Sequence, residues 1–62
     1  MITIHLDGPQ GNVFYILAVA EKIAVKHGIA DFESIEREMK SSDYTNALDV
    51  FRKYFSEYAE LI

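Results

Sequence analysis

The feature that most limits how this chain can fold is the alternation of apolar and polar residues at both of its ends. Residues 2–6 (ITIHL) place an aliphatic side chain at every second position, and residues 57–62 alternate in the same way. This two-residue period predicts a strand with one buried face at each end. Because the chain has only 62 residues, the two strands can best satisfy their backbone groups by pairing with each other. The direction of pairing, parallel or antiparallel, stays open.

The segment between the strands predicts three helices. Residues 13–27 contain no helix breaker, Asn12 precedes them as an N-cap, and Gly28 follows where a left-handed residue ends a helix. A short, charged second helix follows Asp31 as its N-cap, and a third helix covers residues 44–55 with Asp43 as its N-cap. The order β-α-α-α-β defines an α+β fold, with a small sheet under three helices, in one domain over residues 1–62.

The first helix is predicted to be the central element because it has two apolar faces. Its wide stripe consists of Val13, Ile16, Leu17, Ala20, Ile23 and Ala24. A second strip consists of Phe14, Ala18 and Val25, so we expect this helix to touch more than one neighbour. The third helix is predicted to bury Tyr44, Ala47, Leu48, Phe51, Tyr54 and Phe55.

The shortness of the chain points to a partner subunit. A domain of this size buries only about 60% of its unfolded surface, and the absence of cysteine excludes disulfides and thiolate metal sites. A second copy of the chain is the usual remaining way to stabilise so small a hydrophobic core. A two-stranded sheet also leaves two open edges, so we predict a homodimer in which edge pairing extends the sheet to four strands.

Charge and hydropathy narrow the class of partner. The formal net charge of −4 argues against nonspecific binding of nucleic acid, which needs clustered Lys and Arg. The longest nearly uncharged apolar run, residues 13–20, is far shorter than the roughly 20 residues that span a bilayer. With no basic leader at residues 1–6, we expect a cytoplasmic protein with no membrane segment.

The corner DGPQGN, residues 7–12, has two interpretations. As a ligand site, Asp7, Gly8, Gly11 and Asn12 would bind a nucleotide or phosphate at the start of the first helix. The corner nevertheless lacks the Lys-Ser/Thr pair of a P-loop, and it has only G-x-x-G where a dinucleotide fingerprint has G-x-G-x-x-G. As a structural corner, the two glycines adopt backbone angles closed to other residues, Pro9 stiffens the turn and Asn12 caps the helix. We favour the structural interpretation.

Neither a metal site nor a catalytic set is predicted. His5 and His27 are too few to hold a metal ion, and His27 suits the C-terminus of a helix. No Ser, Cys or Thr nucleophile is placed beside Asp7 and a histidine. We therefore predict a protein that is not an enzyme and needs no cofactor.

Four residues are predicted to contact a protein partner. Tyr15 and Tyr58 sit on faces expected to look away from the core, and tyrosine is enriched at interfaces. Glu33 and Glu36 belong to an acidic stretch on the second helix, which is either a solvated face or a surface for a basic partner.

The opening ITIHLDGPQGN and the ending DYTNALDVFRKYFSEYAELI resemble small uncharacterised proteins of tailed bacteriophages and mobile elements, in which an LDGPxGN corner follows the first strand. This resemblance implies an accessory protein that acts in the host cell by stoichiometric binding, either of a host enzyme or defence complex or of a small nucleotide signal. It supplies no catalytic residues. The predicted function is therefore binding of a host or defence protein, with binding of a small nucleotide or phosphate as the alternative.

Overall fold

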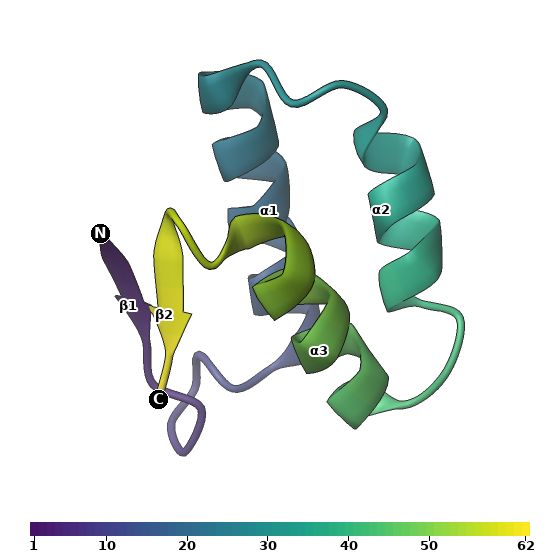
Figure 1. Cartoon of the computed structure of the whole chain (residues 1–62). Helices are drawn as coiled ribbons and strands as arrows, with labels where there is room; N and C mark the ends of the chain where they lie inside the picture. The colour runs from purple at the N-terminus through teal and green to yellow at the C-terminus, as the bar shows by residue number, and fades with distance from the viewer.

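The computed structural model describes all residues from 1 to 62. Its elements are β1 (Ile2–Ile4), α1 (Val13–His27), α2 (Phe32–Met39), α3 (Tyr44–Phe55) and β2 (Ala59–Leu61). The predicted α+β class and the order of elements are confirmed. Figure 1 shows the two strands together on one side and α2 on the opposite side, with α1 and α3 between them.

The two strands form a parallel sheet, which the alternation could not decide. Ile2 pairs with Ala59 and Ile4 pairs with Leu61. Parallel neighbours need a crossover that carries the chain back to its starting side. Here the three helices together make that crossover.

Both strands are shorter than the predicted ranges 2–6 and 57–62. At the start, the chain leaves β1 for a turn in which Gly8 N–H donates to the His5 carbonyl (3.4 Å). At the end, Tyr58 N–H donates to the Phe55 carbonyl (2.9 Å), so this part of the predicted strand is a turn after α3. These turns shorten the strands without ending the pairing, because Ile2 N–H still donates to the Tyr58 carbonyl (3.0 Å) and Leu6 N–H to the Ile62 carbonyl (2.8 Å).

One hydrophobic core joins all five elements. Its buried residues are all hydrophobic, and no buried side-chain polar atom lacks a partner. Phe51 and Phe55 lie in it with their ring centroids 5.2 Å apart, and Ile4 of β1 is fully buried with them. The core residues are Ile4, Ile16, Leu17, Val19, Ala20, Ile23, Ala24, Ile35, Met39, Ala47, Leu48, Val50, Phe51, Phe55 and Ala59.

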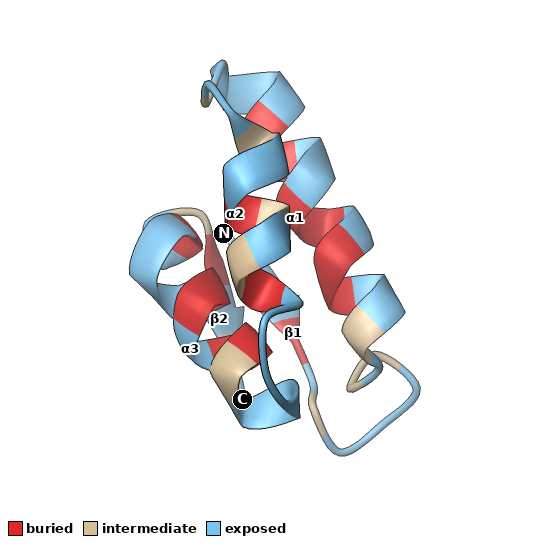
Figure 2. Cartoon of the chain, turned by 90° about the vertical axis from the view of Figure 1, so that its right-hand side faces the viewer, coloured by how far each residue is buried: buried red, intermediate tan, exposed pale blue.

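The predicted burial of α1 is confirmed along most of the wide stripe, where only Val13 is partly exposed. Val19 is buried as well, although it was not assigned to the stripe. The second strip is exposed: Phe14 keeps 75% and Val25 78% of their accessible surface. Figure 2 shows this exposed outer side of α1 beside the buried side that faces the core.

Two tyrosines of α3 were wrongly predicted to be buried. Tyr44 and Tyr54 are exposed, because each hydroxyl forms a hydrogen bond at the surface. A tyrosine can pack its ring while its polar tip stays in water. Val50 takes a buried place on α3 instead.

Three of the four predicted helix ends are confirmed. Asn12 Oδ1 accepts from Phe14 N–H (2.7 Å), and Asp43 Oδ1 accepts from Asn46 N–H (2.9 Å). Gly28 is left-handed at φ 65° and closes α1 with a Schellman motif. Asp31 does not cap α2, because its backbone is left-handed (φ 61°) and its side chain makes no cap bond; a capping residue is normally extended.

None of the three helices is long and apolar enough to span a bilayer.

Candidate functional site

The corner between β1 and α1 consists of two consecutive turns. The first is closed by Gly8 N–H on His5, and the second by Gly11 N–H, which donates to the Gly8 carbonyl at 2.9 Å. The second turn has Pro9 at its second position and Gly11 at its fourth, as predicted.

The two glycines of the corner have different roles, and the prediction that both adopt angles closed to other residues is wrong. Gly28 is the only glycine with positive φ. Gly11 is required for a different reason: a Cβ atom there would overlap the Leu6 carbonyl group, with the carbonyl carbon only 2.7 Å away. Gly8 faces open space. The close approach that Gly11 permits is therefore used by the chain itself.

Gln10 fastens the corner to the elements on both sides. Its Oε1 accepts from His5 N–H (3.0 Å), and its Nε2 donates to the Tyr15 hydroxyl (3.3 Å). One side chain thus bridges the end of β1 and the first turn of α1, which supports the structural interpretation of the corner.

A groove of about 600 Å³ lies beside the corner, between the starts of α1 and α3 and the turn from α2 to α3. We call it the helix-start groove. The Tyr44 hydroxyl donates to the Gly11 carbonyl (2.7 Å) and thereby ties the two helix starts together. The groove is lined by Gly11, Asn12, Val13, Phe14, Leu17, Met39, Lys40, Ser42, Asp43 and Tyr44. Of the predicted ligand residues, Gly11 and Asn12 line it, whereas Asp7 and Gly8 do not.

The groove combines apolar walls with nearly balanced charge. Two helix starts bring partial positive charge to it, and Lys40 adds a cation that pairs with Glu36 (3.3 Å). The negative charge of the Asp43 carboxylate, which also caps α3, offsets these positive charges. Its walls are formed largely by apolar side chains such as Phe14 and Leu17. This arrangement suits an apolar group with a polar edge better than a bare anion.

A second hollow of about 460 Å³ lies at the other end of α1. There the Tyr58 ring stacks on the His27 ring, with centroids 4.1 Å apart and planes inclined by 23°. The prediction that Tyr58 faces away from the core is wrong, because it is half-buried and packs against the core. The hollow is lined by Met1, Ile2, Lys22, Ile23, Lys26, His27, Glu57 and Tyr58.

The four predicted contact residues do not form one surface. Tyr15 is at the start of α1, whereas Tyr58 packs on His27 twelve residues later, about 18 Å along the helix axis. Glu33 is exposed in the first turn of α2. Glu36 alone reaches the helix-start groove, through its ion pair with Lys40.

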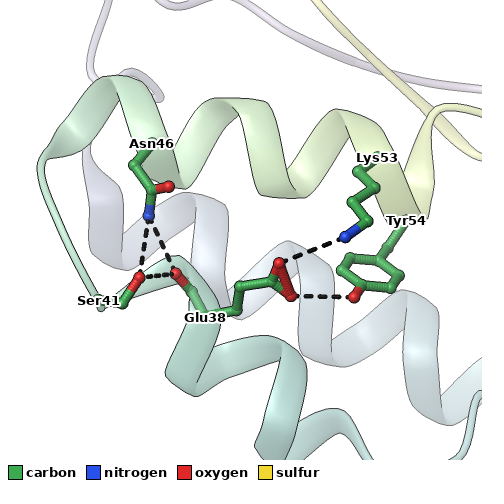
Figure 3. A network of polar contacts seen from close by, with 5 residues as sticks. All are labelled: Glu38, Ser41, Asn46, Lys53 and Tyr54. Carbon is green, nitrogen blue, oxygen red and sulfur yellow. Dashed lines mark hydrogen bonds and ion pairs between the residues drawn. The ribbon is translucent and has the colours of Figure 1, made fainter.

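Glu38 joins α2 to α3 (Figure 3). The sequence did not reveal this role, because Glu38 is one of several acidic residues in the predicted second helix. Its carboxylate accepts from the Tyr54 hydroxyl (2.9 Å) and pairs with Lys53 (3.4 Å). Its carbonyl accepts from Ser41 Oγ (2.7 Å) and Asn46 Nδ2 (3.0 Å). These bonds hold the α2–α3 turn, and therefore one wall of the helix-start groove, in place.

This network changes the pKa of one of its members, Lys53. The Glu38 carboxylate, followed by Tyr54, raises the pKa of the Lys53 ammonium above its ordinary value of 10.5.

No three His, Asp or Glu side chains lie close enough together to hold a metal ion. Comparisons with protein-family models, with curated proteins and with solved structures found no match.

Proposed function

We propose that this chain is a non-enzymatic binding protein that engages a protein partner through the helix-start groove. The observation that carries the proposal is Phe14, which keeps 75% of its surface exposed on the rim of a groove whose walls are largely apolar. An exposed aromatic beside an apolar groove is the usual form of an interface anchor. Its burial by a partner would contribute roughly 1.5–3 kcal/mol.

The resemblance to phage accessory proteins supports a host protein as that partner and the host cytoplasm as the place of action. The polar rim supports a protein partner as well. Lys40, Ser42 and Asp43 surround the apolar walls with one cation, one hydroxyl and one carboxylate, which fits the polar ring that encloses most interface anchors.

The test fills the groove without touching the core. Ser42 is exposed and lines the groove, whereas Ser34 is exposed on α2 and does not line it. We expect Ser42→Trp to abolish capture of the partner from host-cell lysate, while Ser34→Trp captures it as the wild type does. Equal capture by both variants would place the interface elsewhere. The circular dichroism spectrum of each variant checks that the fold is kept.

Binding of a small nucleotide or phosphate is the second candidate. Two helix starts and Lys40 meet at the groove, and its volume lies within the range of about 300–1,000 Å³ that small-molecule sites occupy. The ligand would meet Gly11 and Asn12, with Asp7 and Gly8 outside the site.

Thermal unfolding with inorganic phosphate and with adenosine monophosphate tests this candidate. Binding would raise the melting temperature, and Lys40→Gln would reduce the rise, whereas Lys26→Gln, at the other end of α1, would not. If neither probe moves the melting temperature, or if both variants respond equally, the groove is not an anion site.

A further inference from the structure

The outer face of α1 consists of Phe14, Ala18, Glu21 and Val25, four residues on the side of the helix that points away from the core. Their spacing of four, three and four residues places them on one line along the helix. Phe14 and Val25 are among the most exposed large hydrophobic residues of the chain, at 75% and 78%. Exposing such an apolar face to water is unfavourable, and burying it against another surface is favourable.

We propose that a second copy of this chain covers the outer face, with the two α1 helices packed antiparallel. The spacing is self-complementary. A two-fold axis midway between Ala18 and Glu21 sets Phe14 of each copy opposite Val25 of the other, because both pairs of positions are centred on the same point of the helix. Isologous pairing of this kind is the commonest form of homodimer.

The residues at the centre of the face suit close packing of two helices. Ala18 is small, which lets the axes approach to the 8–10 Å of packed helices. Glu21 of one copy then lies over Ala18 of the other. The two Glu21 side chains are also three residues apart along the axis, about 4.5 Å, and the second copy's Lys22, which each can reach, offsets their repulsion. Neither Glu21 nor Lys22 has an ion pair in its own chain. The antiparallel arrangement also sets the two helix dipoles favourably.

This dimer differs from the sheet-edge dimer that the sequence suggested. Each strand has three residues, so an edge offers little backbone to pair. The α1 face has only four residues, whereas a stable interface buries about 800 Å² from roughly 20–30 residues per partner. We therefore expect a dissociation constant on the order of 10–100 μM.

The dimer and the proposed partner compete for Phe14. This consequence rests on the proposed function, since Phe14 belongs both to the outer face of α1 and to the helix-start groove. Self-association buries the anchor, so only the monomer is free to take the partner. The dimer itself does not depend on that function.

Sedimentation equilibrium from 5 μM to 1 mM tests the dimer. The wild-type mass should rise from 7.1 kDa toward twice that value. Val25→Glu should weaken association at least tenfold, because a carboxylate would face Phe14 of the other copy. The matched control, Ser34→Glu on α2, should associate as the wild type does. A monomer at all concentrations, or a dimer unaffected by Val25→Glu, would overturn the proposal; the latter would indicate the sheet edge.

A cross-link tests the geometry, since the chain has no cysteine of its own. In the antiparallel pair the two copies of Ala18 are three residues apart along the axis, about 4.5 Å. Ala18→Cys should therefore form a disulfide-linked dimer much faster than Ser34→Cys. Equal rates would contradict the antiparallel arrangement. Ser42→Trp separates the two proposals, because it should lose the partner and keep the dimer.

Discussion

Gly11 shows how one residue can be required without any unusual backbone angle. A Cβ atom at this position meets the backbone of Leu6, which cannot move without disturbing β1, whereas Gly8 faces open space. We expect Gly11→Ala to lower the free energy of unfolding by about 2–4 kcal/mol, and Gly8→Ala to change it by less than about 1 kcal/mol. Urea denaturation measures both. Equal effects would mean that the corner is looser than the structure shows. Loss of ligand binding in Gly11→Ala would identify no site, because the fold itself is affected.

Asp31 and Asp43 occupy the same sequence position relative to their helices, but only Asp43 is a cap. Removing a real cap, as in Asp43→Ala, should cost about 1 kcal/mol. Asp31 loses no cap bond when it is replaced, and glycine relieves its left-handed backbone. Asp31→Gly should therefore leave the melting temperature unchanged or raise it. A decrease as large as that of Asp43→Ala would show that Asp31 caps α2 in solution.

At the scale of elements, the joint between α2 and α3 depends more on Asn46 than on the ion pair. Asn46 is partly buried and donates to the Glu38 carbonyl at 3.0 Å, so Asn46→Ala should cost about 1–2 kcal/mol and leave that carbonyl without its amide donor. Lys53 and Glu38 form an exposed pair, and such pairs contribute little. Lys53→Met should therefore leave the urea midpoint at neutral pH almost unchanged. The reverse order of effects would contradict the geometry of this joint.

The same ion pair has a defined pH dependence. Because Glu38 raises the pKa of Lys53 above 10.5, the charged ammonium is favoured in the folded state. Its contribution is complete below the unfolded pKa and is lost as the pH rises through the higher folded value. The small difference in melting temperature between wild type and Lys53→Met should therefore stay constant up to about pH 10 and shrink toward zero above it. A melting-temperature difference that grows as the pH rises above about 10 would show that folding lowers the pKa of Lys53 rather than raising it.

The helices were predictable because their ends carry local signals. Asn12, Gly28 and Asp43 set the bounds of α1 and the start of α3 through bonds to residues a few positions away. The direction of the sheet was not predictable, since alternation is the same in parallel and antiparallel strands. The helix-start groove was only partly predictable: Gly11 and Asn12 belong to the corner, but the opposite wall comes from residues 39–44. Only tertiary packing brings these segments together.

At the scale of the whole molecule, the sheet joins the two ends of the chain. Ile4 is fully buried and pairs with Leu61, 57 positions away. Contacts at so large a separation close a loop of nearly the whole chain, whereas α2 and α3 meet across a short turn. We infer that the helices assemble first and that β1 docks after the main folding barrier.

Stopped-flow kinetics can test this order. Ile4→Val should cost about 1 kcal/mol. If β1 docks late, nearly all of that cost appears as unfolding that is about fivefold faster, with the folding rate unchanged. Val50→Ala, which removes buried methyl groups from α3, should instead slow folding, because α3 packs against its neighbours before the barrier. Slower folding in Ile4→Val would mean that the ends of the chain meet early, and that the parallel sheet organises the helices rather than fastening them once they are packed.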